Sequence, residues 1–185
     1  MKLYALCDKE LLDSKNISIS EFIKIAIQNG AEIVQYRNKK NDSTSIKDEL
    51  ILIKNLFDGI VIINDNYNLV QYCDGVHLGQ EDLFKIDNNI FDAVKTIRDK
   101  IGKEKLLGIS THNKKEVLEA NSMQLDYIGL GAYRDTSTKN ISNILGDEVE
   151  NIASLSKHPV GVIGGVKMDD KFKNITYHVI GSGLL

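Results

Sequence analysis

Short runs of apolar residues recur at regular intervals along the chain, and stretches with helical periodicity separate them. Near-continuous runs of this kind, rich in β-branched residues, are typical of strands buried on both faces, as in a parallel sheet. Eight such runs occur, at residues 3–6, 33–36, 60–63, 75–78, 106–109, 127–130, 160–163 and 177–180. The pattern therefore predicts eight buried parallel strands.

Apolar positions between several of these runs repeat with the spacing of an α-helix. Within residues 46–57, and again within 90–101, they fall at i, i+4, i+7 and i+11, so that each segment would present one apolar stripe. Ser18 and Glu21 have the spacing of a capping box, which predicts that the first helix begins there.

Strands that alternate with helices predict an α/β protein, and eight of them predict a closed (β/α)8 TIM barrel; a doubly wound open sheet is the alternative. The chain has 185 residues, which is shorter than the usual ~200–250 for this barrel. Little room is left for a helix between Val166 and Tyr177, and the sequence stops at Leu185 soon after the eighth strand. We therefore expect one domain, 1–185, forming a shortened barrel whose helices after strands 7 and 8 are reduced or missing.

Composition narrows the class of protein. With 42% hydrophobic and 26% charged residues the chain can bury a core, which excludes a disordered chain. The net charge of −3 gives no reason to expect nucleic acid or a membrane surface as partner, and no apolar run reaches the ~18 residues of a membrane span. Cys7 and Cys73 form neither a CxxC pair nor a disulfide framework, so we expect reduced thiols in a cytoplasmic protein.

Polar and glycine residues collect where the predicted strands end. In a TIM barrel the loops at these ends form the active site. The residues there include Gln35, Arg37, Lys39, Asn64, Asp65, Asp82, Ser110, Thr136, Thr138, Lys139, Gly164, Gly165 and Ser182. Two carboxylates on neighbouring strand exits, beside several cations, are the combination expected for a di- or triphosphate bound with Mg²⁺. The residues thus predict a barrel enzyme that acts on a phosphorylated or pyrophosphorylated small molecule.

Simpler interpretations exist for the charged residues and for the serine. Asp65 and Asp82 could cap the helices that follow their strands. Arg37 and Lys39 could form a solvated charge pair, and Ser110 could be a hydroxyl at a helix start.

The remaining candidates also have simpler interpretations. His77 lies inside a predicted strand, so we expect a hydrogen-bonded residue that lines the barrel rather than a catalytic base. His112 could be a loop histidine, and Lys139 an ordinary loop lysine. Gly164 and Gly165 could serve only the tight geometry between strand and loop.

Several of these stretches together resemble the thiamine phosphate synthase/thiazole tautomerase family. The resemblance is carried by residues 34–39, 63–65, 74–82, 107–112, 126–131, 136–139 and 159–165, and their order and spacing hold from about residue 3 to 182. The run DGVHLGQED at 74–82 is specific to the family. The run IGG at 163–165 would be weak alone, because many phosphate-binding barrels carry it.

The resemblance implies a transferase of thiamine biosynthesis. Such an enzyme joins 4-amino-2-methyl-5-hydroxymethylpyrimidine pyrophosphate to thiazole phosphate and releases pyrophosphate. In that family the pyrimidine methylene ionises to a carbocation as pyrophosphate leaves, and the thiazole nitrogen then captures it. Fixed cations would stabilise the charge that grows on the leaving group.

The resemblance also implies roles for individual residues. Asp65 and Asp82 would hold Mg²⁺ on the pyrophosphate. Its oxygens would be contacted by Arg37, Lys39, Ser110 and Lys139, the four residues expected to be catalytic. The remaining residues would bind substrate. Gln35 would orient the pyrimidine, and Asn64 would also bind substrate. Thr136 and Thr138 would contact the thiazole phosphate or pyrophosphate, and Gly164, Gly165 and Ser182 would donate to the thiazole phosphate.

The chain departs from the family pattern around the expected acceptor site. Arg134 and Asp135 stand where the family usually has an aromatic residue and a proline. The two reduced helices also flank this site, where a helix N-terminus would help to bind the anion. A partner subunit could cover the exposed flank, so a homodimer is possible.

Two other functions therefore remain open. A thiazole tautomerase, which is an isomerase, would not need a pyrophosphate-directed Mg²⁺ site, and the retention of Asp82 argues against it, as does Ala132 where that branch resembles a Gly-His pair. A shortened, non-catalytic relative that binds a thiamine precursor would fit the reduced helices but would have no evident need for the metal carboxylates.

Overall fold

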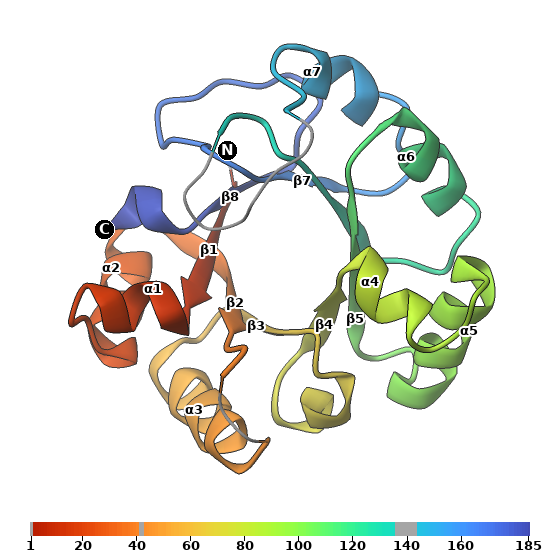
Figure 1. Ribbon diagram of the computed structural model, residues 1–185. Coiled ribbons are helices and arrows are strands. Elements are labelled where there is room, and N and C mark those ends of the chain that lie inside the picture. Colours follow the sequence, from red (N-terminus) through yellow and green to blue (C-terminus); the bar gives the residue numbers. More distant parts are fainter. Residues whose placement is uncertain (1, 41–42, 136–143) are drawn as a thin grey trace.

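Eight parallel strands close into a barrel in sequence order, with the last strand paired to the first (Figure 1). The computed structural model describes residues 2–40, 43–135 and 144–185. The strands are β1 (Lys2–Asp8), β2 (Ala31–Arg37), β3 (Ile60–Asn64), β4 (Gly75–Leu78), β5 (Leu106–Thr111), β6 (Tyr127–Leu130), β7 (Val160–Val162) and β8 (Tyr177–Ile180). All eight predicted strands are confirmed, and the open sheet is excluded because β1 pairs with both β2 and β8.

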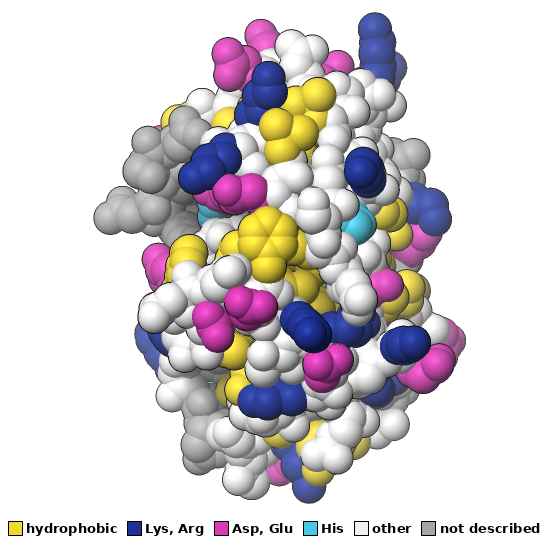
Figure 2. All heavy atoms as spheres, turned by 90° about the vertical axis from the view of Figure 1, so that its right-hand side faces the viewer, with side chains coloured by type: hydrophobic (Ala, Val, Ile, Leu, Met, Phe, Trp, Pro, Cys, Tyr) yellow, Lys and Arg dark blue, Asp and Glu magenta, His cyan; other side chains and the backbone are white. Residues whose placement is uncertain are grey.

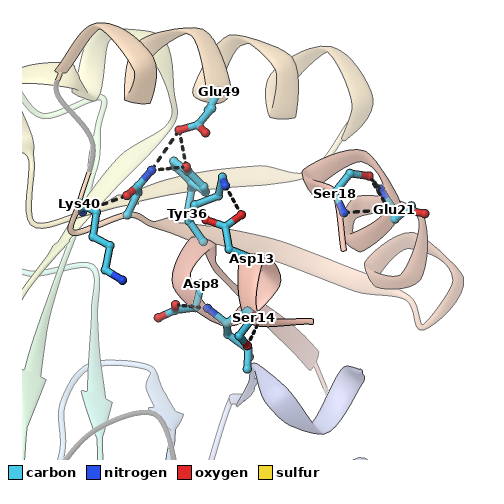
Figure 3. Close-up of polar contacts among 11 residues, drawn as sticks. Asp8, Asp13, Ser14, Ser18, Glu21, Tyr36, Lys40 and Glu49 are labelled. Atoms are coloured by element: carbon cyan, nitrogen blue, oxygen red, sulfur yellow. Dashed lines mark hydrogen bonds and ion pairs between the residues drawn. The ribbon is translucent and has the colours of Figure 1, made fainter. Parts of the chain in front are cut away.

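Helices surround the barrel on its outer face (Figure 1). They are α1 (Lys9–Ser14), α2 (Ile19–Gln28), α3 (Ser43–Leu56), α4 (Gln80–Phe84), α5 (Ile90–Ile101), α6 (Lys114–Ala120) and α7 (Glu148–Ala153), with 3-10 turns η1 (Tyr67–Tyr72) and η2 (Ser182–Leu184). The predicted capping box is confirmed: the Ser18 hydroxyl accepts from the Glu21 amide at 3.2 Å, and the Glu21 carboxylate accepts from the Ser18 amide at 2.8 Å (Figure 3). It opens α2 rather than the first helix, because the short helix α1, capped by Asp8, precedes it.

The strands bury residues on both faces, which explains their near-continuous apolar character. The larger cluster lies between the strands and the helices, and the predicted stripes of α3 and α5 belong to it. A smaller cluster fills the barrel interior, centred on Tyr4, Ile33, Ile62, Tyr127 and Val179. Since successive side chains of a strand point to opposite faces, the odd and even positions of each strand divide between these two cores.

The connection between β7 and β8 contains no helix in the described residues 163–176. After β8 the described chain forms only the short turn η2. The connection between β7 and β8 confirms the predicted reduction of the helix after strand 7. Cys7 and Cys73 are buried free thiols, as expected.

No helix within the described ranges is both long enough and apolar enough to cross a membrane.

Candidate active site

Asp65 follows directly after β3 in a backbone conformation that non-glycine residues rarely adopt. Its φ is 63°, in the left-handed region where a side chain is strained. The Asp65 amide donates to the carbonyl of His77 on the neighbouring strand β4 at 2.9 Å. This bond fixes the carboxyl group at the carboxyl end of β3. Strain of this kind is common at functional sites.

Asp82 lies in the first turn of α4, one strand further along the barrel. The helix begins after Gly79, and no side-chain bond caps it. The 3-10 turn after Asp65, η1, begins at Tyr67 with Asn66 as its N-cap residue, again without a side-chain cap. The capping interpretation is therefore excluded for both aspartates. The Asp82 carboxylate accepts from Lys85 Nζ at 2.7 Å.

The two aspartates face each other and share a hydrogen bond. Burial, the charge of Asp82 and this hydrogen bond together raise the pKa of Asp65 to about 6, although Lys39 and Arg37 act to lower it. For Asp82, partial burial acts to raise the pKa, but Lys85 and the bond to Asp65 outweigh it and hold the pKa below its ordinary value. Two carboxylates this close cannot both ionise freely, so below about pH 6 the pair holds a proton that a bound cation would displace.

The donor set of this pair fits Mg²⁺ acting on a phosphorylated substrate. Within the described part of the chain, no group of three or more His, Cys, Asp or Glu side chains could hold a metal ion. Mg²⁺ is usually bound by one or two carboxylates together with substrate phosphate oxygens and water. Asp65 and Asp82 could therefore hold Mg²⁺ when a phosphorylated substrate supplies the other oxygens.

Arg37 ends β2 at the same edge of the barrel and is held by a buried partner. Its guanidinium forms an ion pair with Asp8, whose other carboxylate oxygen accepts from the Leu11 amide at 3.1 Å and so caps α1 (Figure 3). The Arg37 side chain is 18% exposed, so it is no solvated surface cation. Lys39 is exposed, and its charge acts on both Asp65 and Asp82. The structure thus brings these two cations and the two carboxylates together.

Ser110 and Gln35 lie on strands and belong to the polar lining of the barrel. Ser110 is part of β5, which excludes a hydroxyl at a helix start. Its Oγ lies 3.0 Å from His77 Nε2, and Gln35 Nε2 donates to the Tyr4 hydroxyl at 2.6 Å. Burial lowers the pKa of His77 to about 4, so the ring is neutral. The expectation of a hydrogen-bonded histidine that lines the barrel is confirmed.

The glycine pair after β7 lies against the loop that follows β6. The φ angles are 91° for Gly164 and 62° for Gly165, and a Cβ on Gly164 would lie 2.5 Å from that of Ala132. Arg134 links this pair to the loop after β6, because its amide donates to the Gly164 carbonyl at 2.9 Å. The simpler interpretation, tight packing between strand and loop, is therefore confirmed for this pair.

The expected acceptor end continues at η2. A Cβ on Gly183 would lie 3.3 Å from the Val166 carbonyl, so the loops after β7 and β8 are neighbours. Ser182 begins η2 and is exposed. The glycine pair and Ser182 thus lie on two adjacent loops.

Arg134 connects the loop after β6 to the loop between β7 and β8, which has no helix in its described residues. Its guanidinium forms two parallel bonds to Asp170, at 2.7 and 2.8 Å, and donates to the Gly165 carbonyl at 3.1 Å. Its guanidinium carbon also lies 4.2 Å from the centre of the Tyr133 ring. The departure from the family pattern at position 134 therefore has a structural function: it links the loop after β6 to the loop between β7 and β8.

Not every predicted site residue can be placed. Thr136, Thr138 and Lys139 lie outside the described residues. Asn64 ends β3 and is half-buried, opposite His77 in the register of β4.

Three polar residues were not assigned to the site from the sequence: Asp8 as the partner of Arg37, and the buried hydroxyls of Tyr4 and Tyr127. The two tyrosines could have been found from the alternation of their strands, which turns both toward the barrel interior. The pairing of Asp8 with Arg37 could not, because 29 residues separate them.

Surface grooves lie elsewhere. One of about 630 Å³ is lined by residues of α5 and α6, including Phe91 and Leu118, and another of about 330 Å³ lies between α6 and α7. On the face that carries α4 to α6, cationic, anionic and apolar side chains are interspersed (Figure 2). Neither groove contains a residue predicted for the site. The described residues predicted for the site lie at the polar mouth of the barrel, which is the candidate active site.

Comparisons with known proteins identify the family of the chain. Residues 3–181 match the sequence model of a family described as thiamine monophosphate synthase. The chain is 35% identical over 182 residues to the thiamine-phosphate synthase of Persephonella marina, covering 95% of this chain and 80% of that protein. It is 32% identical over 190 residues to the thiamine-phosphate synthase of Clostridium acetobutylicum, covering 100% of this chain and 85% of that protein.

Solved structures share the fold. A thiamine phosphate pyrophosphorylase from Pyrococcus furiosus superimposes with a TM-score of 0.78 at 23% identity, covering 98% of this chain and 85% of that one. An N-acetylmannosamine-6-phosphate 2-epimerase from Clostridium perfringens superimposes with a TM-score of 0.66 at 16% identity, covering 99% and 87%. At these identities the likeness concerns the fold alone.

Proposed function

The chain belongs to the thiamine monophosphate synthase family, and on that premise we propose that it is a transferase that makes thiamine phosphate. Its substrates would be the aminopyrimidine methyl pyrophosphate and the thiazole phosphate. The C–O bond between the pyrimidine methylene and the pyrophosphate breaks, and its electron pair leaves with the pyrophosphate. The lone pair of the thiazole nitrogen then forms the new C–N bond to the methylene carbon.

The observation that carries this proposal is the Asp65–Asp82 pair at the ends of neighbouring strands, with Arg37 and Lys39 in electrostatic range. The pair fits Mg²⁺, which would supply charge neutralisation to the diphosphate when bound. Arg37, oriented by Asp8, and Lys39 would bind the diphosphate oxygens and oppose the negative charge that grows as the C–O bond breaks. Fixed cations of this kind need no reorganisation at the moment of reaction.

The opposite end of the mouth would bind the acceptor. The amides of Gly164 and Gly165 and the hydroxyl of Ser182 are the donors we assign to the thiazole phosphate. The Arg134–Asp170 pair would hold the loop that carries the glycines, in place of a helix. Gln35 would orient the pyrimidine through its amide oxygen, because its amide nitrogen is bound to Tyr4.

One assay tests the proposal. Purified protein, Mg²⁺, the pyrimidine pyrophosphate and the thiazole phosphate are mixed, and thiamine phosphate and pyrophosphate are followed together. Equal formation of both products is the expected result. No product, combined with Mg²⁺-dependent binding of the pyrimidine pyrophosphate, would overturn it and favour a binding protein. Conversion of a thiazole isomer without pyrophosphate release would favour a tautomerase.

A further inference from the structure

A continuous chain of hydrogen bonds crosses the interior of the barrel. It runs from Gln35 Nε2 to the Tyr4 hydroxyl (2.6 Å), on to the Tyr127 hydroxyl (2.9 Å), to His77 Nδ1 (3.1 Å) and from His77 Nε2 to Ser110 Oγ (3.0 Å). The five side chains come from five different strands, so no local sequence pattern joins them. One end reaches a residue assigned to the pyrimidine and the other a residue assigned to the diphosphate.

The chain is built into the packing of the barrel. Tyr4, Gln35, His77 and Tyr127 are all at least 92% buried. Glycines on β5 and β6 make room for the rings: a Cβ on Gly108 would lie 2.2 Å from the Tyr127 ring, and one on Gly129 would lie 3.1 Å from His77. The His77 and Tyr127 rings stack with centroids 5.5 Å apart.

The donors and acceptors fit one direction of this chain. Gln35 donates to Tyr4 through its amide nitrogen, so the Tyr4 oxygen is an acceptor there. If Tyr4 donates its own proton to Tyr127, Tyr127 donates to His77 Nδ1, and every buried proton has an acceptor. In the reverse direction Tyr4 would accept twice, and its proton would have no acceptor among the side chains described here. A buried hydroxyl left without an acceptor is costly, so the first direction is favoured.

The consequence for Ser110 follows from the tautomer. A neutral imidazole that accepts at Nδ1 carries its proton on Nε2. His77 Nε2–H then donates to Ser110 Oγ, so the serine hydroxyl proton cannot be directed back to the histidine. Ser110 is half-buried at the carboxyl end of β5, beside the mouth of the barrel.

We propose that His77 is a positioning residue: the chain Gln35–Tyr4–Tyr127–His77 holds its imidazole as the Nε2–H tautomer, and this directs the Ser110 hydroxyl proton to an oxygen of the substrate diphosphate. The assignment of the diphosphate as recipient rests on the proposed function. The direction of the chain rests on the hydrogen-bond geometry and on the orientation of the Gln35 amide, whose nitrogen faces the Tyr4 hydroxyl. The same hydrogen bonds thereby connect Gln35, which would bind the pyrimidine, to Ser110, which would stabilise the leaving group.

The tautomer is tested first, without any activity measurement. Protein labelled with ¹⁵N-histidine is examined by NMR at neutral pH, and the His77 signals are assigned with His77→Gln. The expected state is neutral with the proton on Nε2, and Tyr127→Phe should shift the Nδ1 resonance because it removes the donor to that atom. A proton on Nδ1 would overturn the proposal.

The functional half is tested by a double-mutant cycle of Tyr127→Phe and Ser110→Ala. The readout is the Mg²⁺-dependent binding of inorganic pyrophosphate, with kcat measured alongside. In the native background, Tyr127→Phe should weaken pyrophosphate binding and lower kcat, each by about 10-fold. The loss in kcat is smaller than the ~100-fold that removal of one oriented donor can cause, because Ser110 itself remains. It should have almost no effect when Ser110 is already alanine. Equal losses in both backgrounds would overturn the proposal.

Control variants separate positioning from stability. Tyr177→Phe removes another tyrosine hydroxyl from the barrel interior that takes no part in the chain, and should leave binding and kcat unchanged. His77→Gln keeps an amide donor near the Nε2 position and should retain more activity than His77→Asn, which cannot reach Ser110. Loss of activity in proportion to melting temperature across these variants would instead indicate a structural role.

The two proposals fail separately. Absence of thiamine phosphate formation with intact coupling in the pyrophosphate cycle would overturn only the proposed function. Normal thiamine phosphate formation without coupling would overturn only the role of His77.

Discussion

The carboxyl groups of Asp65 and Asp82 are hydrogen-bonded to each other across the ends of β3 and β4. A hydrogen bond between two carboxyl groups requires a proton, and partial burial favours keeping it. Without a cation the pair therefore holds this proton below about pH 6, and it is fully ionised when a cation and a phosphorylated substrate are bound. This exchange gives the candidate site a distinctive pH dependence.

Mg²⁺-dependent binding of pyrophosphate should weaken as the pH falls below the pKa of Asp65, which is about 6. A cation must displace one proton from the pair, so the apparent affinity should fall by about 10-fold for each pH unit below that value. Isothermal titration calorimetry between pH 5 and pH 8 would measure it. An affinity independent of pH across this range would contradict the assignment of the pair.

The stability of the cation-free protein should depend on pH in the opposite sense. The raised pKa of Asp65 means that the folded protein binds this proton more tightly than the unfolded chain, whose ordinary value is 3.8. The contribution to the free energy of unfolding is thus fully present below about pH 4 and is lost as the pH rises through about 6. The free energy of unfolding would be measured by urea denaturation for the native protein and for Asp65→Asn. The difference between the two values should change with pH only between about pH 4 and pH 6.

Asp82→Ala should lower turnover by at least ~100-fold while the protein stays folded. The substitution removes one of the two carboxylates. It removes no capping hydrogen bond from α4, because no side chain caps this helix. Glu104→Gln is the matched control, since it removes an exposed carboxylate from the turn before β5, at the opposite end of the barrel. Unchanged turnover in Asp82→Ala, measured with saturating Mg²⁺, would show that the carboxylate pair is not the metal site.

Asp8→Asn should raise the KM for the pyrimidine pyrophosphate by about 10-fold, because a buried ion pair that orients a substrate-binding cation is lost. Asparagine can still cap α1 by accepting from the Leu11 amide, so the melting temperature should change less than in Asp8→Ala, which also removes the cap. Steady-state kinetics and thermal melts of both variants would separate the two functions of Asp8. Asp13→Asn, at an exposed ion pair on the same helix, should change neither.

Asp170→Asn should raise the KM for the thiazole phosphate several-fold and leave the KM for the pyrimidine pyrophosphate nearly unchanged. The bidentate bond to Arg134 would be weakened, and with it the link between the loop after β6 and the loop that carries Gly164 and Gly165. Lys171→Ala, an exposed residue of the same loop, is the control. Equal changes in both KM values would mean that the Arg134–Asp170 pair supports the whole site rather than the acceptor end.

Much of the site was predictable because it follows from strand order. Parallel strands present their carboxyl ends at one mouth of the barrel, so Arg37, Asp65, Asp82 and Ser110 could be grouped from their positions after or within apolar runs. Their partners could not be predicted. The ion pair of Arg37 with Asp8 and the contact of Ser110 with His77 both join residues about 30 positions apart, and such contacts depend on which strands become neighbours.

The sequence by itself determined the barrel, since eight doubly buried strands and the helical stripes between them have few other ways to bury their apolar surface. It also determined the chemical character of the mouth, because the carboxylates, cations and glycines follow the strands directly. Only the tertiary structure decided how those groups act on one another. Closure of the sheet at β1 and β8 brings Tyr4 to Tyr127, across 123 residues, and the enclosed, poorly solvated interior then sets the proton positions along the chain to Ser110. Proton positions and pKa values depend on distance and burial in three dimensions, which no spacing along the chain contains.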